Sequence, residues 1–107
     1  MTDLADTLQR LMTVIESRRG ADPSTSYTAS LLAKGPQRCA KKFGEEAVEA
    51  ALAGALQDKG ELVSETSDVL YHLLVLLAAN NVTLEEVAEA LSAREGTSGH
   101  DEKASRG

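Results

Sequence analysis

Residues 61–80, ELVSETSDVLYHLLVLLAAN, constrain the architecture more than any other segment of the chain. From Val69 onward almost every position is apolar, so a helix built from these residues is apolar around most of its circumference. Such a helix has to be covered on all sides, and the rest of one short chain hardly suffices for that. We therefore expect this helix inside a bundle that a second copy of the chain completes, as a homodimer.

Helical spacing continues on both sides of this segment. Near the N-terminus apolar residues recur three and four positions apart, and Thr83 with Glu86 forms a capping box that opens a last helix. Gly35-Pro36 separates two further helices, and no stretch alternates with the period of two that is typical of strands. Helices are expected at 4–18, 27–34, 36–56, 60–80 and 83–94. The predicted fold is all-α, a helical bundle of four main helices plus a short connector helix at 27–34.

The chain of 107 residues has room for one domain. We assign residues 1–94 to this all-α domain. Residues 95–107, EGTSGHDEKASRG, are polar and rich in Gly and Ser, so we expect a flexible C-terminal tail.

The charge balance is acidic, with 11 Lys and Arg against 17 Asp and Glu and a net charge of −6. Binding to a nucleic-acid backbone needs a basic surface, so no nucleic-acid partner is expected. The run LLVLLAA is far shorter than the ~20 residues that cross a bilayer, and the N-terminus has no basic signal region. A single cysteine excludes an internal disulfide. These features predict no membrane partner and a cytoplasmic location.

Two acidic segments lie on consecutive helices. Glu45, Glu46 and Glu49 fall within one turn of the long helix at 36–56. Glu65 and Asp68 stand three residues apart on the next helix, so the pair Glu46/Glu49 has a counterpart with the same spacing. The connection LQDKG is short, which makes the two helices antiparallel and lets the acidic pairs face each other.

The acidic pairs allow two interpretations, a solvated face and a cation site. Most acidic runs on helices are solvated faces, and like charges one turn apart cost stability on a bare helix. A divalent cation between the pairs would explain their clustering, and an all-carboxylate set suits Mg²⁺ or Mn²⁺ better than zinc. Both readings remain open from the residues alone.

For both His72 and Cys39, a structural role competes with a chemical one. His72 lies one turn after Asp68, where a lone helical histidine is more often a hydrogen-bonded structural partner than a ligand. Cys39 is expected to be a small packing residue, although Arg38 and Lys41 beside it could lower the pKa of its thiol.

Positive charge gathers just before the first acidic segment, at Lys34, Arg38, Lys41 and Lys42. These side chains could simply pair with the glutamates one turn on. Alternatively, they form the basic rim that a metal-bridged polyphosphate needs. The chain has no GxxxxGK[ST] loop that would hold phosphate instead.

At these residues the sequence resembles the all-α, MazG-like NTP pyrophosphohydrolases, whose signature is EExxE followed by ExxD. The resemblance to the phosphoribosyl-ATP pyrophosphohydrolase family is closer still and covers nearly the whole chain. It is carried by Ser26-Tyr27-Thr28, Lys34-Gly35, Lys41-Lys42-x-Gly44-Glu45-Glu46, Asp68-x-x-Tyr71-His72-Leu73-Leu74 and Lys103-Ala104-Ser105-Arg106. Phe43 departs from the pattern, which has a smaller aliphatic residue there.

The resemblance implies Mg²⁺-assisted hydrolysis of phosphoribosyl-ATP to phosphoribosyl-AMP and pyrophosphate, the second step of histidine biosynthesis. It implies metal ligands at Glu46, Glu49, Glu65 and Asp68. Glu45 is the candidate catalytic residue, either to orient or deprotonate the attacking water or to support the site. Phosphate contacts would come from Lys34, Arg38 and Lys42, with Tyr27 and His72 as supporting residues.

Two other functions compete with this one. A housecleaning nucleoside triphosphate pyrophosphohydrolase would share the acidic signature but not the SYT and KASR segments. A non-enzymatic helical dimerisation module would carry the acids only as a solvated face.

Overall fold

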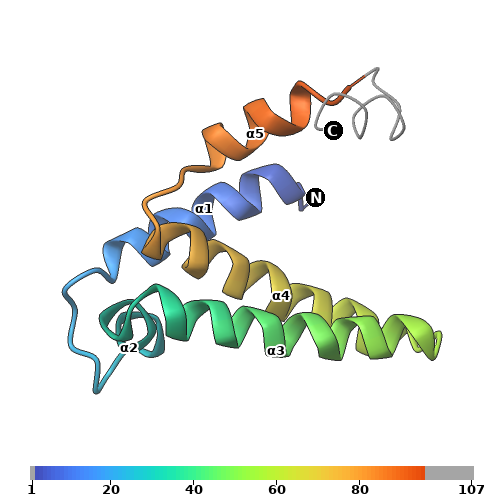
Figure 1. The fold of residues 1–107 in the computed structure, drawn as a ribbon, viewed down its shortest axis with the longest axis horizontal. Helices are drawn as coiled ribbons and strands as arrows, with labels where there is room; N and C mark the ends of the chain where they lie inside the picture. Colours follow the sequence, from blue (N-terminus) through green and yellow to red (C-terminus); the bar gives the residue numbers. More distant parts are fainter. Residues whose placement is uncertain (1, 96–107) are drawn as a thin grey trace.

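The computed structural model describes residues 2–95 and contains, over that range, five helices and no strand (Figure 1). The helices are α1 (Leu4–Ser17), α2 (Tyr27–Lys34), α3 (Pro36–Ala55), α4 (Lys59–Ala79) and α5 (Leu84–Ser92). The all-α prediction is confirmed, and each helix begins and ends within about two residues of its expected bounds. The tail from 96 onward, including His100 and the KASR segment, lies outside the described residues.

Polar side chains at the helix starts explain where the elements begin. The carboxylate of Asp3 accepts a hydrogen bond from the Ala5 amide at 2.8 Å, and Ser26 caps α2 in the same way. Thr83 and Glu86 form the reciprocal capping box that opens α5, as the sequence predicts. Gly35 adopts a φ of +93° between α2 and α3, a conformation that other residues rarely adopt.

The antiparallel pair α3 and α4 forms the long axis of the molecule, and α1 and α2 pack against one end of it (Figure 1). The core lies where α4 meets these helices, and its buried residues come from all four. They are Met12, Ile15, Leu31, Cys39, Leu74, Val75 and Ala78. The chain itself therefore covers the inner side of the second half of α4. A second copy of the chain would have to cover apolar surface elsewhere on the molecule.

Helix α4 has 21 residues, and an 18-residue stretch of it has a mean hydropathy of 1.4, so by length and composition alone it could cross a membrane. This revises the expectation that no segment is long enough. The helix contributes Leu74, Val75 and Ala78 to the core, and a core helix of a soluble domain has the same composition.

Candidate metal centre

A tight turn places the two acidic segments opposite each other. Leu56–Asp58 connects α3 to α4, with Gln57 at a φ of +57°. The carboxylate of Asp58 accepts a hydrogen bond from the Glu61 amide at 3.1 Å and caps α4. The turn reverses the chain, so α4 returns along α3 and the expectation of antiparallel, facing helices is confirmed (Figure 1).

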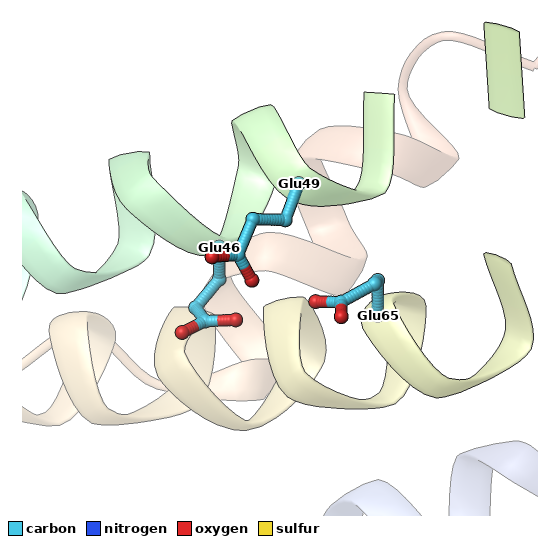
Figure 2. Close-up of side chains that lie close together, drawn as sticks. All are labelled: Glu46, Glu49 and Glu65. Atoms are coloured by element: carbon cyan, nitrogen blue, oxygen red, sulfur yellow. The ribbon is translucent and has the colours of Figure 1, made fainter. Parts of the chain in front are cut away.

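Three carboxylates converge between the two helices. One oxygen from each of Glu46, Glu49 and Glu65 lies within 4.8 Å of the other two (Figure 2). Glu46 and Glu49 extend from one turn of α3, and Glu65 approaches them from α4 (Figure 2). We call these three residues the carboxylate cluster. Three of the four residues predicted as metal ligands are thus brought together.

Asp68, the fourth predicted ligand, is not part of this cluster. Its side chain is exposed, one turn further along α4. Its negative charge nevertheless acts on Glu65, because it is one of the groups that raise the pKa of that residue. Asp68 therefore stands at the margin of the cluster rather than inside it.

Glu65 combines a buried carboxylate oxygen with a raised pKa. Its Oε2 atom is buried and receives no hydrogen bond from residues 2–95. Loss of solvent first, and then the neighbouring carboxyl of Glu49 and the charges of Glu61 and Asp68, raise the pKa of Glu65 from 4.5 to about 7. A buried carboxylate oxygen with no donor is costly unless a cation satisfies it.

The cluster fits a hard divalent cation on chemical grounds. It offers only oxygen donors, and three negative charges lie within the span of one coordination shell. The buried oxygen of Glu65 has no donor among the described residues, so a cation would supply the partner that this atom lacks there. A purely solvated acidic face would leave that oxygen in water.

The basic residues just upstream divide into paired and unpaired groups. Lys42 Nζ lies 3.2 Å from Glu45 Oε2, and this hydrogen bond raises the pKa of Lys42. The predicted helical pairing is confirmed for these two residues. The carboxylate of Glu45 is therefore paired with Lys42 and is not part of the carboxylate cluster. Lys34 and Arg38 are exposed and make no ion pair with any of residues 2–95.

His72 is a buried structural partner, as predicted, and it links α4 to α2. Its Nδ1 donates a hydrogen bond to the backbone carbonyl of Asp68 at 2.9 Å, which leaves Nε2 of the neutral imidazole as an acceptor. The hydroxyl of Tyr27 lies 3.3 Å from that Nε2 and donates to it. The sequence did not reveal a second link, between the hydroxyls of Thr28 and Tyr71, although these residues belong to the Ser26-Tyr27-Thr28 and Asp68-x-x-Tyr71-His72 segments that carry the family resemblance.

Cys39 is a packing residue. Its thiol is buried and donates a hydrogen bond to the carbonyl of Leu31. Burial raises the pKa of the thiol, so the alternative that Arg38 and Lys41 lower it is wrong. The reason is that both cations point to solvent while the thiol faces the core.

Comparison with known proteins finds one family model and similar proteins that match most of the chain. Residues 8–95 match the family model described as phosphoribosyl-ATP pyrophosphohydrolase. A protein of Cereibacter sphaeroides named phosphoribosyl-ATP pyrophosphatase is 62% identical over 100 residues, which cover 94% of this chain and 97% of the relative. A protein of the same name from Paracoccus denitrificans is 60% identical over 92% of both chains, and one from Rhodobacter capsulatus is 58% identical over 94% and 97%.

Proposed function

The chain belongs to the phosphoribosyl-ATP pyrophosphohydrolase family, and we propose that it hydrolyses phosphoribosyl-ATP to phosphoribosyl-AMP and pyrophosphate in histidine biosynthesis. The observation that carries this proposal is the carboxylate cluster of Glu46, Glu49 and Glu65 in a chain that matches the family over residues 8–95. A cluster of this kind repels a triphosphate unless cations lie between the carboxylates and the phosphates.

We propose Mg²⁺, with Mn²⁺ as a substitute, as the cation at this cluster. Glu46, Glu49 and Glu65 would hold it, and Asp68 would join them by a change of side-chain rotamer. When bound, the cation neutralises phosphate charge and favours departure of pyrophosphate. Because binding requires Glu65 to be ionised, the raised pKa of this residue makes affinity for the cation increase through about pH 7.

The remaining chemistry belongs to the protein's own side chains. A water oxygen forms a bond to the α-phosphorus, and the bond from that phosphorus to the bridging oxygen of the β-phosphate breaks, which releases pyrophosphate. The water loses a proton to a base, and we assign this role to Glu45. Its ion pair with Lys42 has a direct consequence: when Lys42 turns to the phosphates, the Glu45 carboxylate becomes free to accept that proton.

Phosphate binding is assigned to Lys42, Arg38 and Lys34. Arg38 and Lys42 lie one turn apart on α3 and continue the face that carries Glu46, so a triphosphate at the cluster would reach them. Lys34 is the last residue of α2 and precedes the turn into α3.

Isotope labelling tests the reaction. The protein, phosphoribosyl-ATP and Mg²⁺ in ¹⁸O-labelled water should give phosphoribosyl-AMP that carries one label and unlabelled pyrophosphate, and EDTA should stop turnover. Ordinary nucleoside triphosphates, assayed in parallel, should be poor substrates. Label in pyrophosphate, or orthophosphate as the first product, contradicts the proposal. Faster turnover of an ordinary triphosphate would instead support a housecleaning enzyme.

The variant Glu45→Gln tests the assignment of the base. If Glu45 activates water, kcat should fall by roughly 10²–10⁴-fold with little change in KM. A raised KM for the metal–substrate complex with an unchanged kcat would place Glu45 among the groups that bind the cation instead.

We also propose that the enzyme is a cytoplasmic homodimer. Exposed apolar side chains remain at Leu4, Leu62 and Val63, beside a groove of about 360 Å³ between α1 and α4. A second copy that packs there would cover this apolar surface. Light scattering at micromolar concentration should give twice the mass of one chain, and a mass of one chain would contradict the assignment.

A further inference from the structure

A second hollow adjoins the carboxylate cluster on the side of the α3–α4 turn. It has a volume of about 390 Å³ and shares Glu49 and Glu65 with the cluster. Its other walls are aliphatic side chains at the end of α3 and its C-cap, and acidic side chains at the N-cap and first turn of α4. We call it the hairpin pocket. These residues are Leu52, Ala53, Leu56, Asp58 and Glu61.

One face of α3 changes its chemistry along its length. Arg38 and Lys42 come first, the glutamates of the cluster follow, and Leu52 and Leu56 come last. The 18 helical steps from Arg38 to Leu56 correspond to about 27 Å along the helix axis. The basic end attracts phosphate, whereas the acidic and aliphatic end repels it. A nucleotide whose phosphates lie at the cluster and at Lys42 therefore has its base toward Leu52 and Leu56.

We propose that the hairpin pocket binds the purine base of the nucleotide, and that Glu61 and Asp58 make it select a base that carries positive charge. This inference rests on the proposed function. Leu52 and Leu56 are 58% and 79% exposed, so they offer an uncovered aliphatic wall to a flat ring. One Asp58 oxygen caps α4, while the other accepts no hydrogen bond from residues 2–95.

The charge of the ligand explains why acids line a nucleotide pocket. The adenine of ATP is neutral at pH 7. An adenine that carries a second substituent on a ring nitrogen is a cation until its exocyclic amine loses a proton. A ribosyl group attached in this way gives phosphoribosyl-ATP a base that Glu61 and Asp58 would attract, whereas ATP gains only weak hydrogen bonds there.

A second copy of the chain is a poorer occupant of the hairpin pocket. A symmetric contact would place Glu49, Asp58, Glu61 and Glu65 of one copy against the same four acids of the other. Like charges at such a contact are unfavourable. The groove between α1 and α4 carries no such concentration of acids among its lining residues.

Binding of product-like nucleotides tests this proposal without turnover. We would titrate the full-length protein in Mg²⁺ with 1-methyl-AMP, AMP and pyrophosphate by calorimetry. The wild type should bind 1-methyl-AMP more tightly than AMP. Leu52→Ser should weaken binding of both nucleotides about tenfold and leave pyrophosphate binding within about twofold. Leu91→Ser is the matched control, because Leu91 is 59% exposed and lies on α5, away from the pocket.

A charge variant tests selectivity separately. Glu61→Gln should reduce the preference for 1-methyl-AMP over AMP about tenfold, and Glu89→Gln on α5 should not change it. Both Leu52 and Glu61 are exposed, so neither substitution removes core packing. Leu56→Ser provides a second test of the aliphatic wall.

Three results would overturn the inference. The first is nucleotide affinity that Leu52→Ser and Leu56→Ser leave unchanged. The second is a halved solution mass in these variants with unchanged nucleotide affinity, because the wall would then be an interface between copies. The third is a preference for 1-methyl-AMP that survives in Glu61→Gln. The proposed function fails separately, if the wild type releases no pyrophosphate from phosphoribosyl-ATP in Mg²⁺.

Discussion

The substitution Tyr27→Phe deletes the hydroxyl oxygen of Tyr27 and thereby removes its hydrogen bond to His72. His72 is 7% exposed, and its Nδ1 is committed to the carbonyl of Asp68. The Nε2 atom therefore keeps a lone pair that only the Tyr27 hydroxyl satisfies among the described residues. The variant leaves this buried acceptor without a donor while the aromatic ring stays in place.

The expected cost follows from this geometry. An unsatisfied buried acceptor destabilises a protein by about 1–3 kcal/mol. The Tyr27 ring is itself 55% exposed, so water can approach from that side and we expect about 1–2 kcal/mol. For a domain of this size, each kcal/mol lowers Tm by about 4–8 °C. Tyr71→Phe should cost less, because its partner Thr28 is only half-buried and can turn to water.

Urea denaturation at one fixed protein concentration measures the effect, since the stability of the proposed dimer would depend on concentration. Tyr27→Phe is compared with the wild type and again in a His72→Leu background. In that background the substitution should cost close to nothing, because the acceptor is gone. The reasoning is refuted if Tyr27→Phe costs under about 0.3 kcal/mol, or if its cost is the same in both backgrounds.

Three further predictions concern the carboxylate cluster and the core. Glu49→Gln or Asp68→Asn should each abolish turnover. In EDTA each variant should be as stable as the wild type or slightly more stable, since a repelling charge is removed. Near wild-type activity in either variant would disprove the role of that residue as a metal ligand. In EDTA the folded state binds a proton at Glu65 that the unfolded chain releases, so stability should decrease from pH 4.5 to about 7, and Glu65→Gln should reduce this dependence in thermal scans. Native Cys39 should react with iodoacetamide at least about 10²-fold more slowly than the unfolded chain, because the thiol is buried and its pKa is raised; equal rates would contradict this packing.

Local signals in the chain were enough to predict the helices. Thr83 and Glu86 lie three residues apart, so they can form a capping box whatever surrounds them. Gly35 and Pro36 divide α2 from α3 for equally local reasons, namely a positive φ and a missing amide hydrogen. The pairing of Lys42 with Glu45 is likewise a property of one helical turn.

The carboxylate cluster depends on packing that spacing cannot specify. Equal spacing of Glu46/Glu49 and Glu65/Asp68 suggests four equivalent ligands, but the register of α4 against α3 places Glu65 in the cluster and Asp68 at its margin. The same packing buries one Glu65 oxygen and thereby changes its proton affinity. Desolvation depends on every neighbour in space, so no pattern along the chain encodes it.

The contact of Tyr27 with His72, 45 residues apart, likewise required the tertiary structure. Each residue lies in a recognisable local segment, yet only the packing of α2 against α4 brings the Tyr27 hydroxyl to the His72 imidazole. The hairpin pocket has the same origin. Leu52 and Glu61 belong to unremarkable turns of their own helices, and they line one hollow because the chain reverses at Leu56–Asp58. Helix formation is a short-range property, whereas the environment of a side chain is set by whatever long-range packing places beside it.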